Sequence, residues 1–470
     1  MLIYNHNSCY PDSIVRFEYY SSMLMRLRFF LLYFICISAH CSFSLSGQDN
    51  VRIREDRKEY VTYPYSDANP FATFGKIYPY YRYDGFASQS EIKAWKIVEL
   101  ENEWLKMQIL PEIGGKIWSV IDKLSGKEMF YGNNVVKFRD ISLRGPWTSG
   151  GIEFNYGIVG HSPNSSFPVD YLLENKSDGS VSCYINTLDL LTRTYWTVEI
   201  NLPADKGWFT TRSFWHNKTG LSQPYSNWVN TGMKAKSDLR FIYPGTDVIQ
   251  HNGERFPWPA DTVNGKDFAQ WRELDFGSSK SFHITGQHAP YFGAYWEDEK
   301  WGIMQYAERD NKLGRKIFSW ALSDQGGIWE ELLTDYDGQY VELQSGRLFN
   351  QNMVTSSPTP FKQTGFAPHG TDVWTEYWFP YRDTDGAANC MYAMSVLMLD
   401  RVYDALDGFQ VAAYTELGKL YFKRGDYASA CGYAGKSLIN NQLNVEGLQL
   451  LYLSNKYLRN DGNAIEVSYT

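Results

Sequence analysis

Strand-like patterning over most of the chain is the feature that most constrains its fold. From about residue 58 to 385, short runs rich in Val, Ile, Tyr, Phe and Trp are interrupted by Gly, Pro, Asn and Asp at intervals of roughly 8–15 residues. Two runs are especially regular: 104–110 alternates and stops at Pro111, and 116–121 follows Gly114-Gly115. This pattern predicts a mainly β protein of stacked antiparallel sheets, rather than a parallel sheet with crossover helices.

The composition changes near Gly386, where the β-branched runs end. From Ala387 onward, Ala, Leu, Met and Tyr recur at helical spacing. One stretch resembles a tetratricopeptide repeat with Gly425-Asp426 in its inter-helix turn, and its pattern residues are Tyr414, Leu417, Gly418, Tyr421, Ala430 and Ala434. A second repeat is marked by Leu448, Leu451 and Ala464. We expect a β domain over 48–385 and helical repeats over 386–470. Because a solenoid needs about three repeats, either these helices dock on the β domain or the array is truncated.

The N-terminal region predicts export. Met25 to Arg28 is basic and 29–37 is apolar, as in a signal peptide, so we expect translation to start at Met23 or Met25. Residues 1–47 are then leader and signal peptide. A lipid anchor on Cys41 is the alternative to a freely soluble mature chain. The expected location is the periplasm or the outer surface of a bacterium, with the protein soluble or lipid-tethered.

The composition favours a carbohydrate as partner. Aromatic residues make up 17% of the chain, including 16 Trp, and flat rings need either burial or a ligand surface such as a sugar face. The net charge is −8 without a basic block, which argues against nucleic acid. After cleavage three cysteines remain, Cys183, Cys390 and Cys431, and their spacing suits neither a zinc site nor a disulfide framework. No nucleotide-binding or phosphate-binding motif is present, so the sequence predicts no metal and no cofactor.

Unusual polar chemistry is concentrated between Arg144 and Pro163. Within 152–156 apolar residues alternate with polar ones, so a strand places a carboxylate and an amide on one face and the apolar side chains on the other. Gly150-Gly151 precedes the strand and allows a tight turn. The stretch predicts a polar pocket with an aromatic wall, lined by Trp147, Glu153, Asn155 and His161. The alternative is a core strand in which Glu153 forms a structural hydrogen-bonded pair.

The segment from Trp329 to Arg347 predicts a β-hairpin. Asp337-Gly338 is a strong two-residue turn signal between two strand-like runs. In that register Glu331 and Glu342 become diagonal neighbours, with Cβ atoms roughly 7–8 Å apart, on a face shared with Tyr340 and Gln344. Carboxylates separated by about 5–9.5 Å are what glycoside hydrolysis requires. The alternative is a surface hairpin with solvated carboxylates.

A second carboxylate lies in the run from Val373 to Phe379. A strand places Trp374, Glu376 and Trp378 on one face, where the acid could bind sugar hydroxyls while the rings stack on C–H faces. Core packing, with Glu376 bonded to an arginine, is the alternative. Arg347 either binds an acidic sugar or pairs with a carboxylate.

The segment from Leu105 to Lys123 resembles the opening strands of galactose-mutarotase-like proteins, whose fold is a large antiparallel β-supersandwich. The stretch from Arg144 to His161 is similar to the Arg-Gly-Gly-Ile turn region of the branch that acts on hexose phosphates. Residues 58–385 together look like an uncharacterised bacterial domain family of this fold that is typically followed by tetratricopeptide repeats. The resemblance implies the fold and leaves the activity open, because this fold serves epimerases, glycosidases, lyases and non-catalytic modules.

The resemblance also implies roles for single residues. Mutarotases use a His as general acid and a late Glu as general base, and Glu342 is the counterpart of that Glu. The Asn-His-x-x-x-Asn strand of the family falls on 227–230, where Trp228 stands in place of the histidine. Trp cannot exchange a proton at neutral pH, so His161 or His216 would have to replace it.

These observations predict an exported carbohydrate-active protein. In the preferred interpretation it hydrolyses a glycosidic bond, with Glu342 and either Glu376 or Glu331 as the carboxylate pair. The residues expected to bind the sugar are Trp147, Glu153, Asn155, His161, Tyr340, Gln344, Arg347, Trp374 and Trp378. One alternative is anomer epimerisation with Glu342 as base and His161 as acid. The other is a glycan-binding module whose helical repeats recruit a protein partner.

Overall fold

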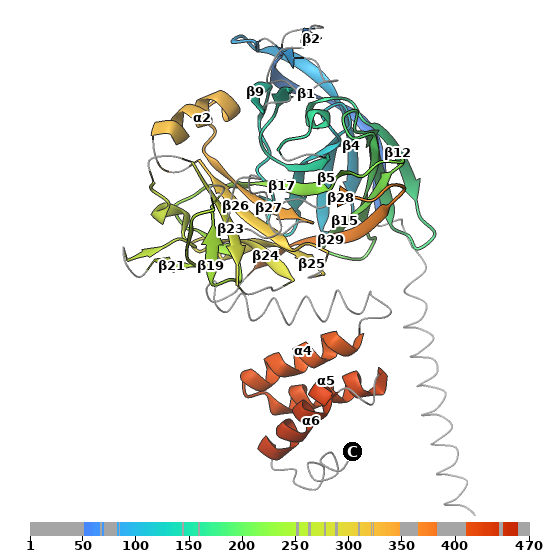
Figure 1. Cartoon of the computed structure of the whole chain (residues 1–470), viewed down its shortest axis with the longest axis vertical. Coiled ribbons are helices and arrows are strands. Elements are labelled where there is room, and N and C mark those ends of the chain that lie inside the picture. Colours follow the sequence, from blue (N-terminus) through green and yellow to red (C-terminus); the bar gives the residue numbers. More distant parts are fainter. Residues whose placement is uncertain are drawn as a thin grey trace, which may run out of the picture. The chain divides into compact units, whose positions relative to one another are not determined.

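The computed structural model describes residues 51–458 with several gaps, of which the longest are 70–81, 348–364 and 383–409. The predicted signal peptide, the 385/386 domain boundary, Cys390 and Ala464 lie outside the described residues. The described chain is mainly β, with two large sheets and a few helices (Figure 1). The predicted fold class is therefore confirmed.

The larger sheet has thirteen strands, which pair antiparallel except for β1 and β8. In spatial order its strands are β20 (Arg255–Pro257), β19 (Asp247–Ile249), β23 (Lys280–Thr285), β26 (Gly314–Ser319), β27 (Tyr340–Gly346), β17 (Ser226–Lys234), β11 (Ile152–Gly157), β6 (Lys116–Asp122), β5 (Leu105–Leu110), β4 (Glu91–Glu101), β1 (Arg52–Tyr63) and β8 (Val135–Lys137), with β7 (Lys127–Glu128) beside β6. The two strands predicted on either side of Gly114-Gly115 are thus present as β5 and β6. Both glycines have a φ of +66°, a conformation that L side chains rarely adopt.

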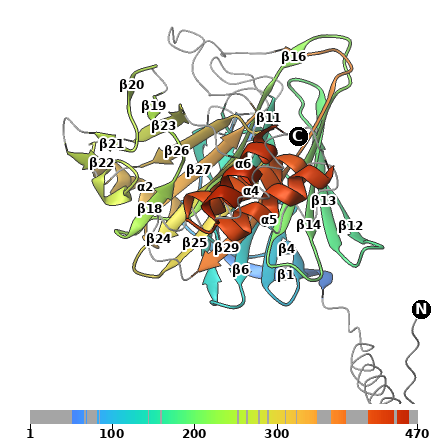
Figure 2. The same ribbon diagram turned by 90° about the horizontal axis from the view of Figure 1, so that it is seen from below.

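The smaller sheet has eight antiparallel strands, and Figure 2 shows its strands β12, β13 and β14 side by side. Their order is β12 (Asp170–Asn175), β13 (Val181–Leu188), β14 (Thr194–Leu202), β15 (Phe209–Asn217), β29 (Thr371–Arg382), β25 (Trp301–Ala307), β24 (Tyr291–Trp296) and β18 (Leu239–Ile242). Short pairs complete the β structure: β2 (Ala68–Asn69) with β3 (Arg82–Tyr83), β9 (Arg139–Ser142) with β10 (Gly145–Trp147), β16 (Gln223–Pro224) with β28 (Gly365–Phe366), and β21 (Ala260–Asp261) with β22 (Lys266–Asp267). Two 3₁₀ turns, η1 (Pro163–Ser166) and η2 (Trp271–Glu273), lie between strands.

The main hydrophobic core joins the two sheets. Ile117, Val229 and Leu343 from the larger sheet pack in one cluster with Val198 and Trp215 from the smaller sheet. Because side chains alternate along a strand, the residues between these positions point to the other face of each sheet. The face of the larger sheet that is turned away from this core carries the polar residues described below.

The predicted hairpin strand before Asp337-Gly338 is wrong, because these residues form the helix α2 (Asp324–Thr334). Trp329 and Leu333 are four residues apart, so on a helix they share one face, and both pack in a cluster with Tyr340. The Asp-Gly turn itself is present, with a φ of +87° at Gly338, but it joins a helix to β27.

The described residues of the C-terminal part form three helices: α4 (Gln410–Lys423), α5 (Tyr427–Asn440) and α6 (Val445–Tyr457). Gly425 and Asp426 lie in the turn between α4 and α5, as the repeat pattern predicts. Leu417, Ala430 and Ala434 are fully buried, so the pattern residues form the helical core. No helix in the described ranges is long and apolar enough to cross a bilayer.

Candidate functional site

The predicted polar strand is present as β11, with the predicted alternation. Phe154 and Tyr156 lie in the main core, whereas Glu153 is in register with Asn230 of β17, which in turn is in register with Gln344 of β27. The three side chains therefore form a row across neighbouring strands, on the face turned away from the core. We call this group and its neighbours the polar face.

Glu153 is the most constrained carboxylate of the polar face. Its side chain is only 2% exposed, and its two oxygens accept hydrogen bonds from Trp147 Nε1 at 2.6 Å and from His161 Nδ1 at 2.9 Å. Lys116 Nζ lies 3.9 Å away. Burial alone would raise the pKa of Glu153, but the charge and hydrogen bond of His161, together with Lys116 and Trp147, outweigh burial and lower it to about 2. Glu153 is therefore a permanent anion near neutral pH.

His161 is the accessible partner of this pair, with 18% of its side chain exposed. Its ring lies between two indoles, at centroid distances of 4.8 Å from Trp147 and 5.0 Å from Trp228. When Nδ1 donates to Glu153, Nε2 becomes the atom that takes up or releases a proton. Trp228, which replaces the histidine of the mutarotase pattern, thus packs against a different histidine. Its own Nε1 donates to the carbonyl of Gly160 at 3.2 Å, next to His161 in the chain.

Glu342 lies on the same face, two strands away on β27. It accepts hydrogen bonds from Tyr340 Oη at 3.3 Å and from Gln344 Nε2 at 2.7 Å, and it is 3% exposed. Burial and the charges of both Glu342 and Glu153 raise the pKa of Tyr340. The structure therefore brings together the predicted residues Trp147, Glu153, Asn155, His161, Tyr340, Glu342 and Gln344.

Two buried lysines on the polar face were missed by the sequence reasoning. Lys116 donates to the carbonyl of Thr148 at 2.6 Å, and its pKa is lowered by burial against the opposing charges of Glu153 and Glu342. Lys316 is in register with Gln344, and burial lowers its pKa to about 8. The signal that could have revealed them is a lysine within an otherwise apolar strand, since a buried lysine is costly without a carboxylate nearby.

Three amide atoms of the polar face are buried and have no hydrogen-bond partner among the described residues. They are Asn155 Nδ2, Asn230 Oδ1 and Gln344 Oε1. A buried polar atom without a partner is costly, and a bound water molecule or a polar ligand can supply the missing hydrogen bond. One unpartnered donor and two unpartnered acceptors suit a ligand rich in hydroxyl groups.

Glu331 does not belong to this site. It lies on α2 and is exposed, so it cannot be the cross-strand neighbour of Glu342 that the hairpin register predicted. The predicted carboxylate pair is wrong because the strand that would have carried Glu331 is a helix.

Glu376 and its flanking tryptophans also lie elsewhere, inside the core between the sheets. Glu376 is fully buried and accepts hydrogen bonds from Ser345 Oγ at 2.6 Å and from Gln305 Nε2 at 2.9 Å, with Lys312 Nζ at 3.2 Å. Ser345 alternates with the polar-face residues of β27, so Glu376 and Glu342 are on opposite faces of that strand. Trp374 and Trp378 are 2% and 1% exposed, which leaves no ring surface for a sugar. The burial of Glu376 and its two flanking tryptophans agrees with the core-packing alternative, although the basic partner of Glu376 is Lys312 rather than an arginine.

Arg347 pairs with a carboxylate, which is one of the two alternatives that the sequence predicted for it. Its Nε and Nη2 each lie 2.8 Å from an oxygen of Asp372, and Nε also donates to Tyr225 Oη at 3.0 Å. The other histidine candidate, His216, lies on β15 of the smaller sheet, with Nδ1 2.9 Å from Thr371 Oγ1. Within the described ranges, no three His, Cys, Asp or Glu side chains are grouped closely enough to bind a metal ion.

Comparison with known proteins places the chain in a family. The family described as "Domain of unknown function (DUF5107)" matches residues 72–381, about two thirds of the chain. The chain belongs to this family. The matched range contains both large sheets apart from β1 and the last residue of β29, and with them every residue of the polar face.

Solved structures show where this fold occurs. A TPR-domain containing protein from Parabacteroides distasonis is 18% identical, with a TM-score of 0.62 over 89% of this chain and 79% of that one. Galactose mutarotase-like proteins are also similar. The one from Lactobacillus casei is 11% identical over 61% of this chain and 100% of its own, with a TM-score of 0.43. The one from Clostridium acetobutylicum is 9% identical over 62% and 96%, with a TM-score of 0.44. At these identities the similarity concerns the fold alone.

Proposed function

We propose that this protein binds an aldose on the polar face and interconverts its anomers, as an aldose 1-epimerase does. The observation that carries the proposal is the contact between Glu153, a buried anion, and Nδ1 of the partly exposed His161, whose ring is packed between two indoles. A histidine oriented by a carboxylate is a common general acid and base, and aromatic rings provide a surface for a sugar ring.

The proposed reaction opens and recloses the sugar ring. Glu342 takes the proton of the hydroxyl at C1, while His161 donates the proton on Nε2 to the ring oxygen as the bond from C1 to that oxygen breaks. The product is the open-chain aldehyde, with the charge of the imidazolium lost and that of Glu342 neutralised. Rotation about the C1–C2 bond and the reverse proton transfers give the other anomer. Glu153 contributes by orienting the imidazole through its contact with Nδ1, which leaves Nε2 as the donor to the sugar.

The proposed sugar site spans the strands that carry Glu153 and Glu342. Glu153 and Glu342 are separated by two strands and two residues, so their Cα atoms lie roughly 12 Å apart. On β17, Asn230 is in register with Glu153 and Gly232 is in register with Glu342, and the backbone of Gly150 packs against Gly232. The unpartnered amide atoms of Asn155, Asn230 and Gln344 lie along the same strands and would hydrogen-bond the remaining hydroxyls.

Glycoside hydrolysis is less well supported by the geometry. It requires two carboxyl groups about 5–9.5 Å apart on either side of one bond. Glu331 lies on a helix and Glu376 lies in the core, so neither pairs with Glu342 across a shared site. The assay below nevertheless includes the release of reducing sugar, because that reaction distinguishes the two chemistries.

The test is to follow anomer equilibration of freshly dissolved α-glucose, α-galactose and α-xylose by polarimetry, with the full chain and with His161→Gln and Glu342→Gln. We expect at least one sugar to equilibrate faster with the wild type, and each variant to lose about 10²- to 10⁴-fold of the enzymatic rate. His216→Gln is the matched control and should retain the rate. A His161→Gln variant as fast as the wild type would contradict the role of His161 as general acid. Release of reducing sugar from an oligosaccharide without any anomer equilibration would contradict the epimerase proposal.

We also propose that the protein is exported and that its helical repeats bind a protein partner. Export is supported by the basic and apolar segments of 25–37, and partner binding by the repeat-like packing of α4, α5 and α6. Cell fractionation of the native host tests the first, with recovery in the cytosol as the contradicting result. Crosslinking in the same host, with and without residues 410–458, tests the second.

A further inference from the structure

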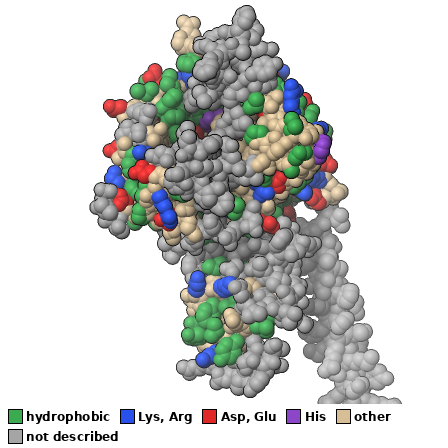
Figure 3. Space-filling view, in the orientation of Figure 1, with side chains coloured by type: hydrophobic (Ala, Val, Ile, Leu, Met, Phe, Trp, Pro, Cys, Tyr) green, Lys and Arg blue, Asp and Glu red, His purple; other side chains and the backbone are tan. Residues whose placement is uncertain are grey.

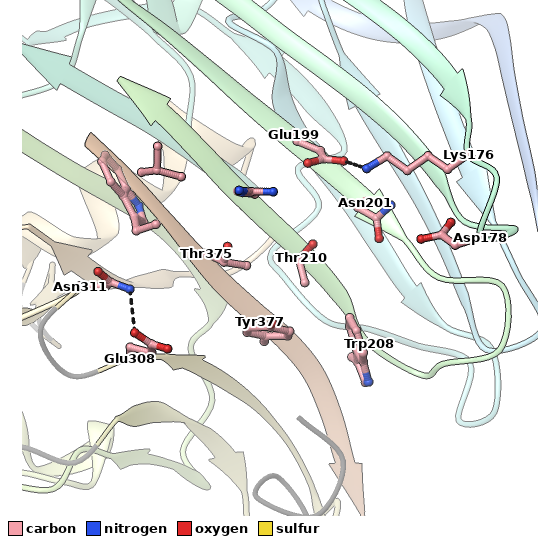
Figure 4. A pocket seen from close by; sticks show the side chains of 13 residues that line it. Lys176, Asp178, Glu199, Asn201, Trp208, Thr210, Glu308, Asn311, Thr375 and Tyr377 are labelled. Carbon is pink, nitrogen blue, oxygen red and sulfur yellow. Dashed lines mark hydrogen bonds and ion pairs between the residues drawn. The ribbon is translucent and has the colours of Figure 1, made fainter. Parts of the chain in front are cut away.

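A second polar site lies on the smaller sheet, separate from the polar face. It is a pocket of about 590 Å³, a size within the range of small-ligand sites. Its floor consists of side chains that share one sheet face, in two cross-strand rows: Thr375 with Arg212 and Glu199, and Tyr377 with Thr210 and Asn201. Figure 4 shows Thr210, Thr375 and Tyr377 on adjacent strands, with Trp208 beyond Tyr377.

Two of the five charged residues that line this pocket compensate each other in an ion pair. Lys176 forms an ion pair with Glu199, drawn as a dashed line in Figure 4, and Glu199 also accepts a hydrogen bond from Ser182. Asp178 accepts hydrogen bonds from both the backbone and the hydroxyl of Ser180. Glu199 therefore has little capacity left for a ligand, whereas Asp178 is exposed and accepts both of its hydrogen bonds on Oδ1.

Arg212 and Glu308 are the other two charged residues that line the pocket. Neither forms an ion pair with any residue that the structure describes, and Glu308 accepts only a long hydrogen bond of 3.3 Å from Asn311 Nδ2. Arg212 lies over the ring of Phe214, with its guanidinium carbon 4.8 Å from the centroid. The two groups act on the phenol of Tyr377 in opposite directions, because Glu308 raises its pKa and Arg212 lowers it. Arg212 is in register with Thr375, and Glu308 follows Ala307, which is in register with Glu376. A strong donor and a strong acceptor therefore lie on either side of β29.

This combination selects the chemical class of the ligand. An anionic ligand would be repelled by Glu308, and a cationic one by Arg212. Hydroxyl groups both donate and accept, so one neutral ligand can bond Arg212 and Glu308 through different hydroxyls, while Thr210, Thr375 and Asn201 bond others. Trp208 is partly exposed and packs against Tyr377, with ring centroids 5.4 Å apart. Its indole lies at one end of this row of polar side chains, where a sugar ring can stack on it.

We propose that this pocket is a binding site for a neutral oligosaccharide chain, distinct from the polar face. The track of Arg212, Thr375, Thr210 and Asn201 crosses three strands, which suits an extended polyol better than a compact zwitterion. The site needs none of the chemistry assigned to His161 and Glu342, so it can exist whether or not the protein epimerises sugars.

Isothermal titration calorimetry of the full chain tests this site. The probes are the hexasaccharides of xylose, glucose (β-1,4 and α-1,4) and mannose, with hexagalacturonate as an acidic probe and alanine as a zwitterionic probe. We expect at least one neutral hexasaccharide to bind, and Arg212→Met to weaken it about tenfold or more. Trp208→Ala should weaken the same ligand. Arg57→Met, at an exposed arginine on β1, is the matched control and should bind as the wild type does.

The variant His161→Gln separates this site from the polar face. Neutral hexasaccharide binding that survives His161→Gln but not Arg212→Met supports the pocket, even if the protein shows no epimerase activity. Binding that is lost in His161→Gln and kept in Arg212→Met overturns it. It is equally overturned if no neutral hexasaccharide binds, or if hexagalacturonate or alanine binds more tightly than all of them.

Discussion

At the scale of single residues, Glu153 shows how a site residue also determines the dependence of folding stability on pH. Its pKa is lowered from 4.5 to about 2 by its partners, so the folded state binds its proton less readily than the unfolded chain. This stabilisation is fully present above a pH of about 4.5 and is lost as the pH falls through 2. This difference in pKa between the folded and unfolded states corresponds to a contribution on the order of 3 kcal/mol to the free energy of unfolding. We therefore expect Glu153→Gln to destabilise the protein by that order at pH 7 and by much less at pH 2.

Chemical denaturation of wild type and Glu153→Gln at pH 7, 5, 4 and 3 measures this effect. Glu103→Gln, at an exposed position, is the control for a carboxylate without these partners. The expected result is a stability difference that is constant at pH 7 and 5 and shrinks at pH 3. A difference that stays constant down to pH 3 would contradict the assigned role of Glu153 as a stabilised anion.

Residue chemistry also explains which site residues the sequence could predict. Glu153 and His161 were found because they are close in the chain and because one strand orients them. Glu376 was equally conspicuous between two tryptophans, but its environment depends on Lys312 and Ser345, which reach it from other strands. A strand pattern gives the face on which a side chain lies and cannot tell whether that face is covered by another sheet.

At the scale of elements, the turn before β11 tests the link between local conformation and the site. Gly151 has a φ of +61°, and a Cβ there would lie 2.2 Å from the carbonyl oxygen of Ile117. Gly126 has a φ of +70°, but no atom lies within 4 Å of its added Cβ. Both alanine substitutions should therefore cost about 1–2 kcal/mol for the left-handed conformation, and only Gly151→Ala adds a backbone clash.

We expect Gly151→Ala to lower the midpoint of thermal unfolding clearly more than Gly126→Ala. It should also displace Glu153, two residues further on, and so reduce the rate of anomer equilibration. Circular dichroism melts and the polarimetric assay measure both effects. Equal midpoints for the two variants would mean that the turn relaxes without cost and does not position β11.

Helix α2 shows where element prediction failed and why. The run from Trp329 to Thr334 is a reasonable strand and also a reasonable helix, because Glu and Leu are good helix formers and short apolar runs do not distinguish the two. The Asp-Gly signal was correct as a turn and wrong as a hairpin, since a helix can end at the same turn. What decides between them is the packing of Trp329 and Leu333 under Tyr340, a tertiary contact.

At the scale of the whole molecule, the fold class followed from the strand pattern, whereas the site depends on which strands are neighbours. The polar face draws Lys116, Glu153, Trp228, Lys316 and Glu342 from five strands far apart in the chain. The order β26, β27, β17, β11, β6 is not the order of the sequence, so no local rule predicts it. On the face seen in Figure 3, the described acidic and basic side chains are scattered, so surface charge does not indicate the site either.

The separate hydrophobic clusters predict how the molecule divides. The clusters of the β structure contain no described residue beyond Tyr381, and the cluster around Leu417 consists of helix residues alone. A chain that stops after residue 385 should therefore keep its β core intact. We expect its thermal midpoint to stay within about 2 °C of the corresponding transition in the full chain, with anomer equilibration unchanged and the helical circular dichroism signal reduced. A large drop in the midpoint or aggregation of the shortened chain would mean instead that residues beyond 385 contribute to the β core, and the predicted boundary at 385/386 would have to move.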